Sequence, residues 1–237
     1  MTQFALAHAA DGTAQELAAQ CAAQLSGDGD HTLGFIYVTD QLAASLDEII
    51  ETLTARTSVE NWVGTVGFGI CATASEYFER PAVAILTGRF SDDEFRLIAP
   101  VNNPSTMAER VNGGFAAAMG IVHVDPRNPR AIDLVSSFAH DSGAYLVGGL
   151  TSAESTFAQI ANGIVDGGLS GVQIGGRRQV TFGLTQGCSP VGPPHRITKG
   201  QGNVLAELDG RPALDVLYEE ADITAGADPR TSLANRD

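Results

Sequence analysis

The stretch LGFIYVTD at residues 33–40 is an apolar run that ends in polar residues, which is typical of a buried β-strand. Residues 41–57 follow it with apolar side chains at helical spacing, at Leu42, Leu46, Ile49, Ile50 and Leu53. This spacing puts the apolar side chains on one side of a helix, which we expect to cover one face of a sheet. The stretch therefore predicts a strand followed by a helix and indicates the α/β class.

The rest of the chain continues this alternation of strands and helices. Further strands are predicted at residues 62–72, 82–87, 95–101, 121–124, 171–175 and 180–185, and further helices at residues 106–119 and 131–140. Short strands at residues 195–198 and 203–208 and a helix at residues 213–220 are predicted near the carboxyl end. Such a pattern favours mixed sheets with flanking helices.

Two segments of the chain resemble each other, GFGICATASE at residues 67–76 and VGGLTSAE at residues 147–154. Each follows a strand–helix pair and precedes a strand rich in glycine or alanine. We therefore expect an internal duplication of a strand–helix–strand unit, with two like half-units packed on each other as two mixed sheets with helices on their outer faces. The alternative is that Gly-x-Thr/Ser-Ala-Glu is turn chemistry used twice.

Charge and composition exclude several classes of function. The net charge of −14 opposes binding to nucleic acid and to anionic membrane surfaces, and no cluster of lysine and arginine interrupts it. No apolar run approaches the ~20 residues that a membrane span requires, and the amino terminus does not have the pattern of a signal peptide. Three separated cysteines form no CxxC pair. The sequence predicts a cytoplasmic protein without a disulfide framework.

Four short segments carry a resemblance to a known family. They are GGLSGV at residues 167–172, QGCSPVGPP at residues 186–194, GNV at residues 202–204 and ELDGRPAL at residues 207–214. In order and spacing they resemble the junction between the two domains of FIST proteins. The preceding strands and helices are similar to a FIST N domain, which we expect at residues 1–207. The resemblance implies that residues 208–237 are the start of a FIST C domain, truncated in this chain.

The resemblance also implies a function. FIST domains are regarded as intracellular sensory modules that bind small ligands such as amino acids and relay the signal to a downstream signalling protein. The expectation for this chain is therefore a sensor with a small-molecule ligand and a protein partner. Three alternatives remain at this point: a haem-binding nitric-oxide sensor, a cysteine-dependent enzyme, and an interaction module that senses nothing, as in F-box relatives.

The expected ligand site combines strand ends with the segment most similar to the family. Polar groups follow two presumed strands, Thr73, Ser75 and Glu76 in one case and Thr151, Ser152 and Glu154 in the other. Ligands in α/β proteins bind at the carboxyl ends of strands, and glycine allows a backbone to approach a ligand. The predicted site is Gly149, Thr151, Ser152, Glu154, Gln186 and Cys188. Ordinary turn capping is the alternative for these polar groups.

Histidine and cysteine offer the remaining chemistry. None of the five histidines lies in an HxH, HxxxH or HExxH pattern, so no metal site is expected. If the protein bound haem, His140 or His123 would be the axial ligand; the alternative for His140 is an interaction with the negative end of a helix dipole. Cys188 has only His195 and Asn203 as a conceivable base and orienting group. We therefore expect no enzyme and no cofactor.

Overall fold

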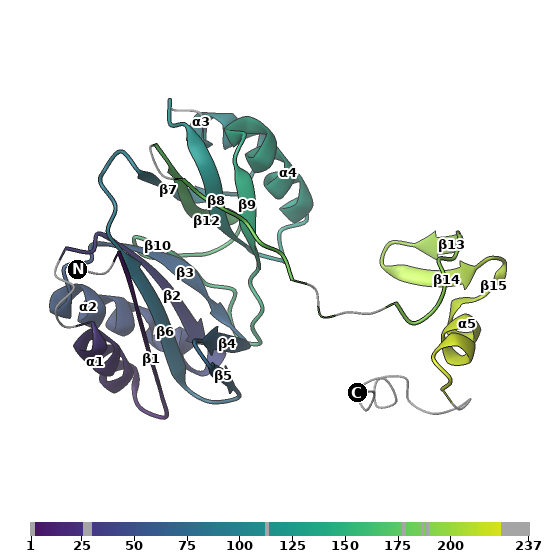
Figure 1. Cartoon of the computed structure of the whole chain (residues 1–237), viewed down its shortest axis with the longest axis horizontal. Helices are drawn as coiled ribbons and strands as arrows, with labels where there is room; N and C mark the ends of the chain where they lie inside the picture. The colour runs from purple at the N-terminus through teal and green to yellow at the C-terminus, as the bar shows by residue number, and fades with distance from the viewer. Residues whose placement is uncertain are drawn as a thin grey trace. The chain divides into compact units, whose positions relative to one another are not determined.

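The computed structural model describes residues 3–25, 30–111, 114–176, 179–185, 187 and 190–223. The chain divides into two compact units, Met1–Thr181 and Phe182–Asp237. In Figure 1 the larger unit runs from purple to green and the smaller one is yellow-green to yellow. The division follows Thr181, whereas the sequence places the boundary between the family domains near Leu208. That boundary stays a prediction.

The larger unit is built from two half-units with the same order of elements. The first contains β1 (Phe4–Ala10), α1 (Ala14–Gln24), β2 (Leu33–Thr39), the 3-10 turn η1 (Asp40–Ser45), α2 (Leu46–Arg56), β3 (Asn61–Gly67), the hairpin β4 (Gly69–Ala72) and β5 (Ser75–Phe78), and β6 (Ala82–Gly88). The second contains β7 (Phe95–Val101), the 3-10 turn η2 (Pro104–Thr106), α3 (Met107–Val111), β8 (Ala117–Val124), α4 (Ala131–Ser142), β9 (Tyr145–Leu150), the hairpin β10 (Gln159–Ala161) and β11 (Ile164–Val165), and β12 (Leu169–Gly175).

The two half-units also share one sheet topology. The strands are ordered β1-β6-β2-β3 in the first and β7-β12-β8-β9 in the second. The hairpins differ, because β10 and β11 extend the first sheet beyond β3, whereas β4 and β5 form a separate two-stranded sheet. In both half-units, the last two strands of the four-strand order are parallel and the remaining pairs are antiparallel. The predicted duplication of a strand–helix–strand unit is confirmed.

Two glycines at which a Cβ atom would clash with the neighbouring strand, called crowded glycines here, identify equivalent positions in the two half-units. Gly64 of β3 lies opposite Ile36 of β2, and Gly148 of β9 lies opposite Val122 of β8. A Cβ atom at Gly64 would lie 1.7 Å from the Ile36 carbonyl oxygen, and one at Gly148 would lie 1.9 Å from the Val122 carbonyl oxygen. Both strands therefore need glycine at the same place.

This correspondence corrects the register that the sequence letters suggested. The two similar segments put residue 67 beside residue 147, but the strand pairing puts residue 64 beside residue 148, so Gly67 corresponds to Thr151. Residues 67–76 form the turn into the hairpin β4–β5, whereas residues 147–154 form the end of β9 and the segment after it. The similarity of letters arose from glycine-rich strand ends rather than from equivalent positions.

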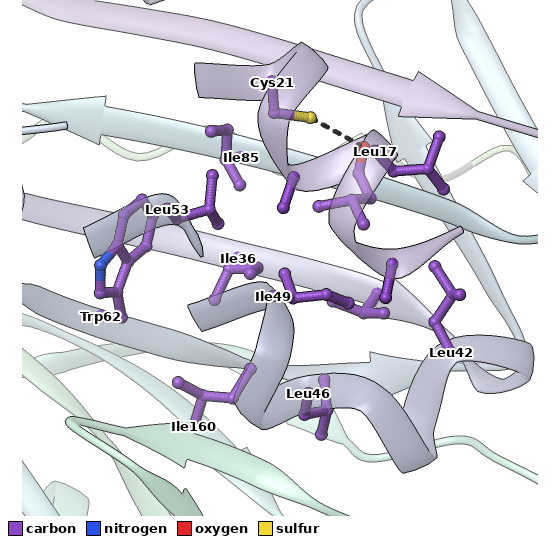
Figure 2. Packing of buried hydrophobic residues seen from close by; sticks show 14 of the residues in the cluster. Leu17, Cys21, Ile36, Leu42, Leu46, Ile49, Leu53, Trp62, Ile85 and Ile160 are labelled. Atoms are coloured by element: carbon purple, nitrogen blue, oxygen red, sulfur yellow. Dashed lines mark hydrogen bonds between the residues drawn. The ribbon is translucent and has the colours of Figure 1, made fainter. Parts of the chain in front are cut away.

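The larger unit has four layers, with both sheets between two pairs of helices (Figure 1). Helices α1 and α2 cover the outer face of the first sheet, where Leu17, Ile49 and Trp62 are fully or almost fully buried (Figure 2). Leu134 and Phe138 of α4 pack on the outer face of the second sheet. A separate apolar cluster that includes Phe35, Val63 and Val172 joins the two sheets. The predicted layered α/β architecture is confirmed.

Three predicted elements differ from the structure. The strand expected at residues 62–72 is two strands, β3 and β4, which belong to different sheets. The helix expected at residues 106–119 is only α3, because Gly114 has a left-handed backbone with φ of 77° and β8 begins at Ala117 to pair with β12. The strand expected at residues 180–185 is absent, since these residues are mostly exposed and pair with no strand in the described part of the chain. β1 and α1 were not predicted, and α1 begins with a capping box between Thr13 and Glu16.

The smaller unit is a three-stranded sheet with one helix. Its elements are β13 (Ile197–Gln201), β14 (Val204–Leu208), β15 (Arg211–Pro212) and α5 (Ala213–Glu220), close to the elements predicted there. His195 lies between two carboxylates, with Nδ1 2.7 Å from Asp209 and Nε2 2.7 Å from Glu220. Across both units, none of the helices among the described residues is long and apolar enough to cross a membrane.

Candidate functional site

A cavity of about 290 Å³ lies where the parallel strands of the two half-units end. The first half-unit contributes its lining from β2, β3 and β4, and the second from β8, β9 and the residues after β9. The lining residues are Tyr37, Thr65, Val66, Gly67, Gly69, Ile70, Cys71, His123, Gly148, Gly149, Leu150 and Ser152. The duplication therefore creates a site to which each half-unit contributes a strand pair.

Tyr37 and His123 are the central polar pair of this cavity. Tyr37 follows Ile36 on β2, and His123 follows Val122 on β8, so the two hold equivalent positions. The Tyr37 hydroxyl oxygen lies 3.2 Å from Nε2 of His123, and the two rings pack edge to face with centroids 5.6 Å apart. Each side chain points from its own sheet toward the other, which is why they meet.

Burial keeps both members of this pair uncharged at neutral pH. The side chain of His123 is 3% exposed, and desolvation lowers its pKa to about 4. Burial also raises the pKa of the Tyr37 phenol above its ordinary value. Among the described residues, the lining contains no Asp, Glu, Lys or Arg. The described lining therefore combines apolar groups with a few uncharged polar ones.

One ring nitrogen of His123, a lining residue, has no hydrogen-bond partner within the described part of the chain. Nδ1 of His123 is buried and accepts or donates no hydrogen bond there. Leaving a buried donor or acceptor unsatisfied costs about 1–3 kcal/mol. Such groups are few in native proteins, and a bound water or ion, a catalytic role or local strain accounts for them. A small movement of the His123 ring would be needed before a molecule in the cavity could hydrogen-bond to this nitrogen.

Two threonines hold the strand ends together behind the cavity. The Thr65 hydroxyl donates to the Ala158 carbonyl oxygen at 3.0 Å, so its contact of 2.8 Å with Thr151 requires the Thr151 hydroxyl to donate. Thr151 is 2% exposed and does not line the cavity. Next to it, the carbonyl oxygen of Ser152 accepts a hydrogen bond from the Phe68 amide at 2.5 Å. These bonds fix the two half-units to each other at the edge of the site.

The structure brings some of the predicted site residues together. Gly149 and Ser152 line the cavity, whereas Thr151 lies behind it in the contact with Thr65. Glu154 is exposed and does not line the cavity; its neighbour Ser155 bonds to the Asp40 carboxylate. Gln186 and Cys188 lie outside the described residues. The ligand-binding role of all six remains a prediction.

The two histidines considered for haem lie in different surroundings. His123 lines the cavity, but 290 Å³ is at the lower end of the volumes of ligand pockets and too small for a porphyrin macrocycle. His140 is exposed on the last turn of α4 and does not line this cavity. Its position at the carboxyl end of a helix suits the favourable interaction of an imidazolium with the helix dipole. The residues of this cavity do not fit haem.

Tyr37, Thr65 and Cys71 were missed by the sequence analysis. Tyr37 lies in a strand that is otherwise apolar, and its equivalence with His123 becomes visible once Gly34 is aligned with Gly120 and Gly64 with Gly148. That alignment was the one signal that could have found it. Cys71 is exposed on β4 and lines the cavity because the hairpin folds back over its own sheet. Nothing in the local sequence indicates that fold-back.

Comparison with known proteins places the residues of this site within a segment that matches a family of domains. A family model described as the FIST N domain matches residues 32–211, which include every residue that lines the cavity. Two proteins of Mycobacterium tuberculosis, from strains CDC 1551 / Oshkosh and ATCC 25618 / H37Rv, are each 28% identical over 183 residues, and both are described as uncharacterized. The match covers 73% of this chain and 48% of each relative. The chain thus spans about half the length of the curated relatives it matches.

Proposed function

The chain belongs to the FIST family, and we propose that it is a sensory domain that binds a small metabolite in the cavity between its half-units and relays this binding to a signalling protein. The observation that carries the proposal is that buried His123, a residue of the cavity lining, has an Nδ1 without a partner among the described residues. A ligand that hydrogen-bonds to this nitrogen removes the cost of leaving it unsatisfied.

The lining limits the chemistry of the ligand. Since the described lining contains hydroxyl, imidazole, thiol, backbone and apolar groups but no charged side chain, the part of the ligand that enters it is neutral. An amino acid or a related metabolite meets this requirement if its side chain enters and its ammonium and carboxylate groups stay at the solvated mouth. Charged groups placed deep in the cavity would lose their hydration without gaining a counter-ion.

The two-part construction of the cavity supports a sensing role. A ligand in it contacts β2, β3 and β4 of one half-unit and β8 and β9 of the other. A second packing of the half-units would have a differently shaped cavity, and we propose that the ligand binds the two arrangements unequally. Unequal binding is the physical requirement for a ligand to shift a conformational equilibrium.

A thermal-shift panel tests the proposal. Amino acids, their amides and related metabolites are added to the wild-type chain. At a concentration one hundred times its Kd, a ligand raises the unfolding free energy by about 2.7 kcal/mol, which for a unit of this size corresponds to about 5–10 °C in Tm. The variant Gly149→Ala adds a methyl group to the lining at a position with nothing within 4 Å of the new atom. We expect it to weaken ligand binding without loss of the fold.

Gly183→Ala is the matched control, because that glycine also has open space around its Cβ position and does not line the cavity. A ligand shift that Gly149→Ala and His123→Gln leave unchanged would place the binding site elsewhere. The absence of a shift with every compound in the panel would count against the amino-acid class.

We further propose that the domain is not an enzyme, and that it acts in the cytoplasm without nucleic acid or membrane as a partner. The net charge of −14 supports the last two points. The cavity pairs a neutral imidazole with a phenol, and no described residue of its lining supplies a carboxylate to orient the imidazole as a general base. Ester, thioester and amide substrates should give no turnover. Turnover that disappears in Cys71→Ala or Cys188→Ala would contradict this proposal.

A further inference from the structure

The outer edge of β9 differs from the equivalent edge of the other half-unit. β3, the counterpart of β9, pairs with β2 on one side and with β10 on the other. β9 pairs with β8 on one side, and its second side pairs with no strand among the described residues. The edge of β9 is also exposed and apolar, with Val147 37% and Leu150 59% exposed. An apolar strand edge of this kind is a template for pairing with another strand.

The duplication shows how such an edge is covered. β10 runs antiparallel to β3 and places Ile160 opposite Gly64. Ile160 is fully buried there and belongs to the main apolar core, as Figure 2 shows beside Leu46 and Trp62. A large apolar side chain thus lies beside the crowded glycine. Gly148 is the equivalent glycine of β9, and its neighbouring position in the sheet is open.

We propose that a second copy of this chain covers this edge, with β9 of each copy paired antiparallel across a twofold axis centred on Val147. This register places Leu146 of each copy opposite Gly148 of the other, which repeats the arrangement of Ile160 and Gly64. An isologous contact requires the same patch on both copies, and a strand paired with itself meets this requirement. The two four-stranded sheets then form one continuous sheet.

Charge is compatible with this occupant. Each copy carries a net charge of −14, which opposes association in general. The strand YLVGGL at Tyr145–Leu150 has no charged side chain, so like charges do not face each other across the contact. Pairing of the edge therefore buries apolar side chains and backbone groups without burying a charge.

Sedimentation velocity over a range of concentrations, at an ionic strength that screens the net charge, tests this inference on the full chain. We expect a reversible dimer. Val147→Lys puts two lysines opposite each other at the centre of the contact and should raise the dimer dissociation constant about tenfold or more. Leu6→Lys is the control, because Leu6 is 42% exposed on β1, another edge strand, and should leave the dimer intact.

An engineered disulfide between the two copies tests whether β9 pairs with β9 in the proposed register. Val147→Cys in a Cys71→Ser background should form a disulfide-linked dimer under mild oxidation, and the Cys71→Ser parent should not. A monomer at every concentration would overturn the inference, and so would a dimer that Val147→Lys leaves unchanged. The inference does not depend on the proposed ligand, so either can fail alone.

Discussion

The hydroxyl oxygen of Tyr37 lies 3.2 Å from Nε2 of His123, and the two residues occupy the same position in the two half-units. Each follows the residue opposite the crowded glycine of the next strand, Gly64 in one case and Gly148 in the other. The duplication has therefore brought two different polar side chains together at the pseudo-equivalent centre of one cavity. The candidate site is therefore built from equivalent positions of the two duplicated half-units.

The pH dependence of stability tests the burial of His123. Its pKa is lowered from 6.5 to about 4 by desolvation, so between these values the unfolded chain binds more protons than the folded chain. The free energy of unfolding therefore falls as pH decreases through this window, by about 3 kcal/mol in total. His123→Gln cannot ionise and retains an amide near the position of Nε2. Denaturant unfolding at pH 7 and pH 4.5 should show a smaller loss in this variant than in the wild type, and equal losses would contradict the buried neutral imidazole.

Substitution by alanine should affect the unfolding free energy very differently at two adjacent glycines of β9. Gly148 has φ of 130°, and a Cβ atom there would lie 1.9 Å from the Val122 carbonyl oxygen, so Gly148→Ala should lower the unfolding free energy by about 2–4 kcal/mol. Gly149→Ala meets no atom within 4 Å and should change it by less than about 1 kcal/mol. Urea unfolding compares the two variants. Similar unfolding free energies for both would show that the pairing of β8 with β9 is wrong.

His195 predicts a pH dependence of opposite sign in the smaller unit. Hydrogen bonds to Asp209 and then to Glu220 raise its pKa above 6.5, because only the imidazolium donates from both nitrogens. A raised pKa in the folded state means that this stabilisation is complete below pH 6.5 and is lost as pH rises through the folded value. An NMR titration of the His195 ring should give a pKa above 6.5, and Asp209→Asn should lower it. A value at or below 6.5 in the wild type would contradict the two-carboxylate arrangement.

The cysteines predict a difference in reactivity. Cys21 is fully buried on α1, its thiol lies 3.8 Å from the Val83 carbonyl oxygen, and burial raises its pKa to about 12, whereas Cys71 is exposed on β4. The thiolate is the reactive form, so Cys21 should resist alkylation until the chain unfolds. Iodoacetamide labelling of the native chain, followed by peptide mapping, should modify Cys71 and leave Cys21 unmodified. Labelling of Cys21 at the same rate as Cys71 would show that α1 does not pack as in Figure 2.

Much of the fold could be predicted because its signals are local. The apolar run at residues 33–40 and the helical spacing after it indicate β2 and α2, and α4 and α5 follow from the same kind of spacing. The helix predicted to extend to residue 119 failed because pairing of β8 with β12 overrides the helical preference of Ala116-Ala117-Ala118. α1 was missed although its Thr13–Glu16 capping box is a local signal.

The candidate site was less predictable. Gly149 and Ser152 could be named because glycine and hydroxyl residues at strand ends have a local meaning, but the exposed Glu154 shows the same pattern and does not line the cavity. The partner of His123 lies 86 residues earlier in the chain. No local pattern specifies such a contact.

The amino-acid sequence was sufficient to predict the α/β class, the family and most of the strands and helices, because hydrophobic periodicity and short motifs act over a few residues. It indicated two like half-units only through the repeated order of strands and helices, since the letters that looked alike are not at equivalent positions. Only the tertiary structure decided the register of the duplication, the meeting of Tyr37 with His123, and the open edge of β9. These features depend on which strand lies beside which, and that is set by the packing of the two sheets against each other and by the glycines that permit it. Side chains distant in sequence are brought into contact only by that packing.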